Sequence, residues 1–135
     1  MKSKAQEIAN YHGNEQKAFV IKELGDLSRF RLNGNRVLVA TYIQPKKSRG
    51  GIIFTDNQTD ESIYQGKVGY IVKLGALAFV NDDKTDFAGF HPEVGDWVFY
   101  RPALAEMQLR YNGIDCRVFS DDKIAGDTLD PEAMW

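Results

Sequence analysis

The chain has 135 residues, of which 43% are hydrophobic and 27% are charged, and its net charge is −2. This length and composition fit one globular domain whose hydrophobic core is large enough to be stable without a structural metal or a disulfide. With this net charge the protein lacks the overall positive charge that attracts nucleic acid. No apolar run approaches the roughly 18 residues of a membrane span. Because Cys116 is the only cysteine and no secretory signal opens the sequence, we expect a cytoplasmic protein.

The N-terminal segment differs in pattern from the rest of the chain. Residues 3–24 carry rough apolar stripes at helical spacing, and Gly25 is a suitable end for a helix. From residue 30 onward the periodicity changes to that of short strands. We therefore interpret residues 1–28 as a partly helical extension of the main domain.

The first predicted strand covers residues 36–43, where side chains alternate between two apolar faces. One face carries Val37, Val39, Thr41 and Ile43, and the other carries Leu38, Ala40 and Tyr42. A second strand is predicted at 67–74, with Val68, Tyr70, Val72 and Leu74 on one face. A third strand is predicted at 96–101. Residues 44–62, between the first two strands, are polar and turn-rich apart from an apolar island of three residues.

The clearest local signal is a hairpin at residues 106–119. Asn112-Gly113 separates two alternating runs, and this pair suits the positive φ angles of a type I′ turn. After Ser120 the sequence turns polar, and we expect no sustained strand there. Several short strands without helices between them predict a mainly all-β fold, an antiparallel barrel or sandwich.

Four segments, in order, resemble the GroES-type co-chaperonin family (chaperonin-10). They are residues 30–39 (FRLNGNRVLV), 50–55 (GGIIFT), 65–75 (QGKVGYIVKLG) and 94–99 (VGDWVF). The resemblance implies a GroES-like antiparallel β-barrel at residues 29–126, with a mobile loop at 45–62, a roof-like segment at 75–93 and a C-terminal tail at 127–135. The divergence from the family pattern favours a phage-encoded member.

The function implied by the resemblance is capping of a GroEL-type chaperonin ring and assistance of ATP-dependent protein folding. The residues expected to bind the chaperonin are Gly50, Gly51, Ile52, Ile53 and Phe54. A single loop of this kind binds weakly, because ordering its backbone offsets much of the apolar burial. The resemblance therefore also implies a homo-oligomeric ring, a heptamer in the family, in which weak contacts multiply.

The sequence departs from the family in three places. Residues 1–28 have no counterpart, and the stretch between Gly75 and Gly95 is unusually aromatic. Residues 123–126 do not resemble the apolar final strand that pairs with the neighbouring subunit in this family. One hypothesis is that the N-terminal extension replaces that contact.

Other interpretations stay open at this point. The Gly-Gly-Ile-Ile-Phe run is also typical of a buried strand after a turn. The same barrel could serve as a structural or decoration subunit of a larger, viral particle. Basic residues at 46–49 suggest nucleic-acid or phosphate binding only weakly, since they match no phosphate-binding motif.

The sequence contains no arrangement that predicts an enzyme, a cofactor or a metal site. His12 and His91 form no metal-ligand pattern with Cys116, which we interpret as a small core residue. The acidic pairs 82–83 and 121–122 lie in expected turns, where solvation is the simplest explanation for paired carboxylates. We expect no nucleic-acid or membrane partner.

Overall fold

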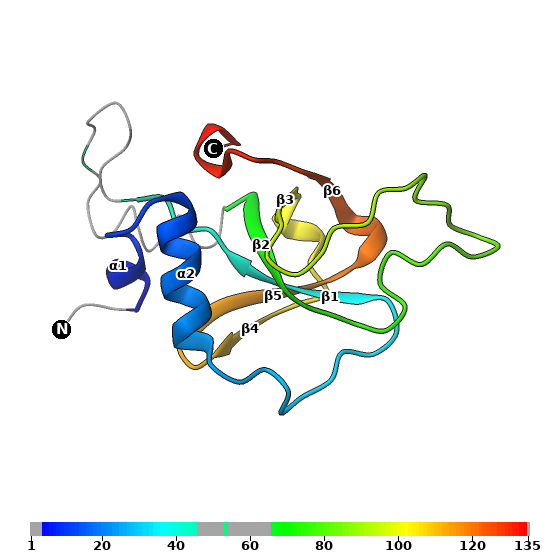
Figure 1. Ribbon diagram of the computed structural model, residues 1–135, viewed down its shortest axis with the longest axis horizontal. Helices are drawn as coiled ribbons and strands as arrows, with labels where there is room; N and C mark the ends of the chain where they lie inside the picture. Colours follow the sequence, from blue (N-terminus) through cyan, green and yellow to red (C-terminus); the bar gives the residue numbers. More distant parts are fainter. Residues whose placement is uncertain (1–3, 46–52, 54–65, 135) are drawn as a thin grey trace.

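The computed structural model describes residues 4–45, 53 and 66–134 (Figure 1). Within these residues the helices and strands follow in the order α1 Lys4–Ile8, α2 Gly13–Leu24, β1 Arg36–Thr41, β2 Val68–Leu74, β3 Trp97–Tyr100, β4 Met107–Tyr111, β5 Ile114–Ser120 and β6 Ile124–Asp127. Three short 3-10 turns are η1 Pro102–Leu104, η2 Asp121–Lys123 and η3 Pro131–Met134. In the described part of the chain, no helix has the length and apolar character needed to cross a membrane.

All six strands join one antiparallel sheet in the order β4-β5-β1-β2-β3-β6. The prediction of a mainly β, antiparallel fold with a helical N-terminal extension is therefore confirmed. The sheet is not closed, because the pairing of the described residues ends at β4 on one side and at β6 on the other. β1 lies near the middle of the sheet, where it pairs with β5 on one side and with β2 on the other.

Alternation along β1 divides the core between the two faces of the sheet. Leu38, Ala40 and Tyr42 belong to one buried cluster, and Val37 and Val39 belong to the other. This confirms the predicted faces for those five residues, which have β-branched or aromatic side chains at most positions. The prediction is wrong for Ile43, which packs in the same cluster as Tyr42 because it lies beyond the end of β1 at Thr41, where strand alternation no longer applies.

β2 contains an irregularity that the alternation did not predict. Its pairing with β1 steps from Leu38↔Lys73 to Val39↔Ile71, so Val72 is an extra residue in the ladder. A one-residue bulge reverses the faces of the residues beyond it. As a result Leu74 packs against the cluster opposite to that of Val72, and its predicted face is wrong.

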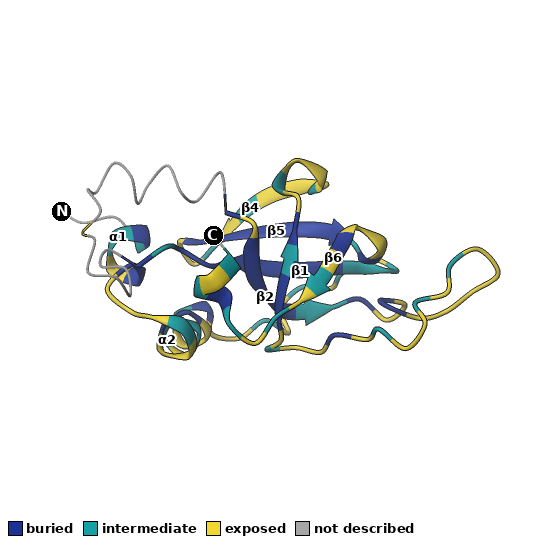
Figure 2. Cartoon of the chain, turned by 90° about the horizontal axis from the view of Figure 1, so that it is seen from above, coloured by how far each residue is buried: buried dark blue, intermediate teal, exposed yellow. Residues whose placement is uncertain are grey.

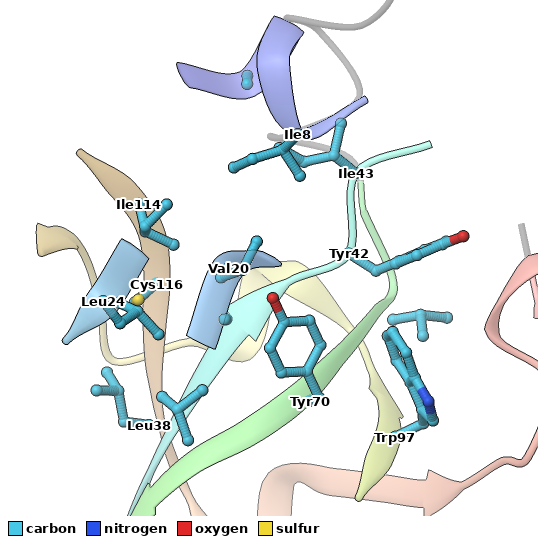
Figure 3. Close-up of a cluster of buried hydrophobic side chains, with 14 of the residues drawn as sticks. Ile8, Val20, Leu24, Leu38, Tyr42, Ile43, Tyr70, Trp97, Ile114 and Cys116 are labelled. Atoms are coloured by element: carbon cyan, nitrogen blue, oxygen red, sulfur yellow. The ribbon is translucent and has the colours of Figure 1, made fainter. Parts of the chain in front are cut away.

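The N-terminal helices cover one face of the sheet. Ile8, Val20 and Leu24 are at most 2% exposed and share a cluster with Leu38 and Tyr70 from the strands (Figure 3). In Figure 1, α2 runs beside the sheet rather than away from it. The extension thus contributes side chains to the same core as the strands.

The β4–β5 hairpin closes as predicted. Asn112 and Gly113 have φ angles of 51° and 81°, the left-handed values that a type I′ turn requires. The Asn112 side chain also donates from Nδ2 to the carbonyl of Leu24 at 2.7 Å. α2 ends there, and Gly25 follows with φ 70°, so the expected helix end is confirmed.

The expectation of no sustained strand after Ser120 is wrong. Residues 124–127 form β6, which pairs with β3 through Val98↔Asp127, Phe99↔Gly126 and Tyr100↔Ile124. Of these four residues only Ile124 is buried, so the strand lacks the apolar alternation that reveals strands in a sequence. Its backbone pairing with β3 holds it in place.

The segment between β2 and β3, residues 75–96, contains no strand. It projects beyond the sheet in Figure 1, and much of it is exposed in Figure 2. Aromatic residues nevertheless pack together within it. Phe79 is 3% exposed, and its ring makes edge contacts with the rings of Phe87 and Phe90, at centroid distances of 5.5 and 5.8 Å. The aromatic residues noted in the sequence therefore build a small apolar base for this segment.

Candidate functional site

The predicted docking segment, residues 45–62, lies in the sequence between β1 and β2, which are adjacent strands of the sheet. Four of its predicted binding residues, Gly50, Gly51, Ile52 and Phe54, lie outside the described residues. The fifth, Ile53, has 76% of its surface exposed. The structure thus describes one predicted contact residue, together with the residues that directly precede and follow the segment.

The two ends of this segment lie side by side. Thr41, at the end of β1, is the register partner of Gly69 in β2. The N–H of Tyr42 then donates to the carbonyl of Val68 at 2.9 Å, one step beyond the strand. We call residues 42–45 the outgoing end and residues 66–67 the returning end.

Buried charged residues of β5 contact the returning end and the last residue of β1. Arg117 is 3% exposed, and its Nη1 donates to the carbonyl of Gly66 at 3.0 Å. Asp115, two residues earlier in β5, accepts from Thr41 Oγ1 at 2.9 Å and from Gln108 Nε2 at 2.6 Å. Charged groups are rarely buried without such partners, because desolvation is costly. This arrangement could not be predicted from the sequence, since alternating charged residues in a hairpin usually face solvent.

The outgoing end is held by α2. Gln16 is 0% exposed and exchanges two hydrogen bonds with the backbone of Ile43. Pro45, the last described residue before the gap, is also buried. Both ends are therefore fixed to the folded domain, one by the extension and one by β5.

Burial affects titratable side chains of the core, among them Cys116 and Tyr70. Burial raises the pKa of the Cys116 thiol to about 12, and Asp115 adds to this effect. Burial likewise raises the pKa of Tyr70 well above its ordinary value. Both groups keep their protons at neutral pH, and Cys116 is a core residue as interpreted from the sequence.

The two acidic pairs have different roles. Asp82 is exposed and accepts from the backbone N–H groups of Lys84 and Thr85, hydrogen bonds that lower its pKa. This fits the expected solvated turn. For Asp121 the expectation is wrong: this side chain is 5% exposed and accepts from the N–H of Phe79 at 2.9 Å. It also accepts from Asn35 Nδ2 at 2.9 Å, and it ties the projecting segment to the sheet.

No group of three potential metal ligands gathers among the described residues. His12, which forms no metal-ligand pattern in the sequence, lies with its Nδ1 2.7 Å from Glu132 Oε1. Glu132 belongs to η3, so this contact joins the N-terminal extension to the C-terminal tail.

A small antiparallel β-domain that holds both ends of a long inter-strand segment is suited to presenting that segment to a partner. The family model of the chaperonin 10 Kd subunit matches residues 30–127 of this chain, and the chain therefore belongs to that family. The resemblance to the GroES-type co-chaperonins is confirmed by this match. α1 and α2 precede the matched region. A search of curated proteins found no match to this chain.

Proposed function

We propose that this chain is a co-chaperonin that docks onto a GroEL-type chaperonin ring and assists ATP-dependent folding of proteins. Docking would use Gly50, Gly51, Ile52, Ile53 and Phe54. The observation that carries the proposal is Ile53, a large apolar side chain that is 76% exposed between two strand ends held by buried hydrogen bonds. Membership in the chaperonin 10 Kd subunit family supports the same partner.

Apolar burial on the partner supplies the attraction. An isoleucine that becomes fully buried contributes roughly 1.5–3 kcal/mol. Ordering the segment costs roughly 1–2 kcal/mol for each backbone residue, so one segment binds weakly and releases easily. A ring of identical subunits, heptameric by resemblance to the family, multiplies the weak contacts through effective concentration.

The unclosed sheet supports assembly into such a ring. Within the described residues, β4 and β6 each pair with one neighbouring strand and leave the other side as a sheet edge. Sheet edges present backbone groups that can pair with another chain. A contact between two different edges repeats head to tail and closes into a ring when the rotation permits.

The proposal is tested with the unmodified chain and a purified chaperonin ring. We expect co-purification of the two in ADP or ATP, and a single ring-sized species of this protein in light scattering. Recovery of a denatured client should rise when the protein is added to chaperonin and ATP. A folded chain that stays monomeric at micromolar concentrations and never binds the chaperonin would contradict the proposal and favour a structural subunit instead.

A further inference from the structure

Ile43 lies beyond the last strand pairing of β1, yet its backbone is fully bonded. The residue is 2% exposed, so its N–H and C=O groups need partners within the protein. Gln16 Oε1 accepts from the N–H of Ile43 at 3.0 Å, and Gln16 Nε2 donates to its carbonyl at 2.7 Å. One side-chain amide thus takes the place that a neighbouring strand would occupy.

Position 16 is an unusual place for a polar residue. Gln16, Val20 and Leu24 recur at four-residue spacing, and they are the buried residues of α2. Packing alone would favour an apolar side chain there, because a buried amide is costly unless its groups are bonded. Gln16 also donates from Nε2 to the carbonyl of Tyr11 at 3.1 Å, so both of its polar atoms are used. The backbone of Ile43 explains why glutamine occupies this position.

The two hydrogen bonds coincide with a break in the strand alternation. Continued alternation would place Ile43 on the same face as Val37 and Val39. Instead Ile43 packs in the cluster of Tyr42 and Ile8, the part of the core drawn in Figure 3. The alternation of the strand therefore ends where Gln16 contacts the chain.

Tyr42 adds a second link at the same place. Its hydroxyl accepts from the N–H of Gly13, the first residue of α2, at 3.0 Å. The hydroxyl in turn donates to Glu132 Oε1 in the C-terminal tail at 3.2 Å. The outgoing end is thus bonded at two consecutive residues to α2, a helix that lies outside the family match.

We propose that α2 positions the chaperonin-docking segment, with Gln16 as the positioning residue that fixes the direction in which the chain leaves β1. This inference rests on the proposed function. Because the outgoing end is bonded to α2, the segment leaves the folded domain from a defined position. In a ring, this pre-organisation raises the effective concentration of every segment at its site.

The test compares two variants of the full-length chain. Gln16→Met keeps the length of the side chain and removes its hydrogen bonds to Ile43. Val20→Ala is the matched control, since Val20 is buried on the same face of the same helix and makes no hydrogen bond to the outgoing end. Both are measured below their unfolding transitions, by hydrogen exchange at the Ile43 amide and by affinity for a chaperonin ring in ADP.

We expect Gln16→Met to speed exchange at Ile43 and to weaken chaperonin affinity by about tenfold or more, because a small loss per segment multiplies around a ring. Val20→Ala should bind as the unmodified chain does. Equal affinity of both variants would overturn the inference while leaving the proposed function intact. Failure of the unmodified chain to bind would overturn the proposed function and this inference together.

Discussion

Truncating one buried side chain of α2 tests whether the N-terminal extension belongs to the cooperative fold. Leu24 is 1% exposed and packs in the cluster that contains Leu38 and Tyr70 of the sheet. Leu24→Ala removes three carbon atoms, a transfer loss of about 2.4 kcal/mol at ~0.8 kcal/mol for each buried carbon. The cavity left behind raises the expected cost to about 2.7–5 kcal/mol. Urea unfolding monitored by tryptophan fluorescence measures it, since Trp97 lies in the same cluster.

Ile21→Ala on the same helix is the matched control. Ile21 is 45% exposed, so the substitution should change the unfolding free energy by less than about 1 kcal/mol. The two variants should differ by at least about 2 kcal/mol with a single transition in both. A loss below about 1 kcal/mol for Leu24→Ala, or a separate early transition for the helix, would refute the shared core.

Three further substitutions or treatments probe the sheet and its core. Gly69→Ala should lower the thermal midpoint by more than about 4 °C, because its Cβ would lie 2.5 Å from the carbonyl oxygen of Ala40. Asp121→Ala should cost about 1–3 kcal/mol in urea unfolding, since it leaves the buried N–H of Phe79 without its acceptor. Cys116 should resist iodoacetamide at about pH 8 until the chain unfolds, because burial keeps it protonated. The pKa of this thiol is raised by folding from 9.0 to about 12, so its contribution to stability is complete below pH 9.0 and is lost as pH rises towards 12.

Each of these expectations has a clear contrary result. An unchanged midpoint for Gly69→Ala would mean that β1 and β2 have room for a side chain at that point. Asp121→Asn keeps one carbonyl acceptor and should cost less than Asp121→Ala; an equal cost would remove the role assigned to the hydrogen bond from Phe79. Rapid labelling of Cys116 in the folded protein would show that the thiol is not enclosed.

Much of the sheet could be predicted because its signals are local. Alternation along residues 36–42 and the Asn112-Gly113 pair specify a strand and a turn without reference to the rest of the chain. The faces of Ile43 and Leu74 could not be predicted in this way. Leu74 depends on a bulge in the pairing of β2 with β1, and Ile43 lies beyond the end of β1, where its backbone is bonded to Gln16 of α2.

In the candidate site, too, some features could be predicted from local sequence and others depend on distant contacts. The apolar island of the docking segment stands out in the sequence because polar residues surround it. The residues that hold its two ends, Gln16 and Arg117, gave no signal. They lie 27 and 51 residues from the backbone groups they bond, and a buried polar side chain resembles an exposed one until its partner is known. β6 was missed because it is held by its partner strand and not by its own pattern.

Under the proposed function, Ile53 belongs to a segment that docks onto a chaperonin. Ile53→Asp would place a charge in an apolar groove, where an unpaired ion is very costly. Leu129→Asp is the control, because Leu129 is 100% exposed in the C-terminal tail. The decisive measurement is the affinity of each variant for a chaperonin ring in ADP, alongside its thermal midpoint. We expect Ile53→Asp to abolish binding with an unchanged midpoint and Leu129→Asp to leave both unchanged. Unchanged binding by Ile53→Asp would contradict the claim, and a collapse of its midpoint would show that Ile53 is a core residue.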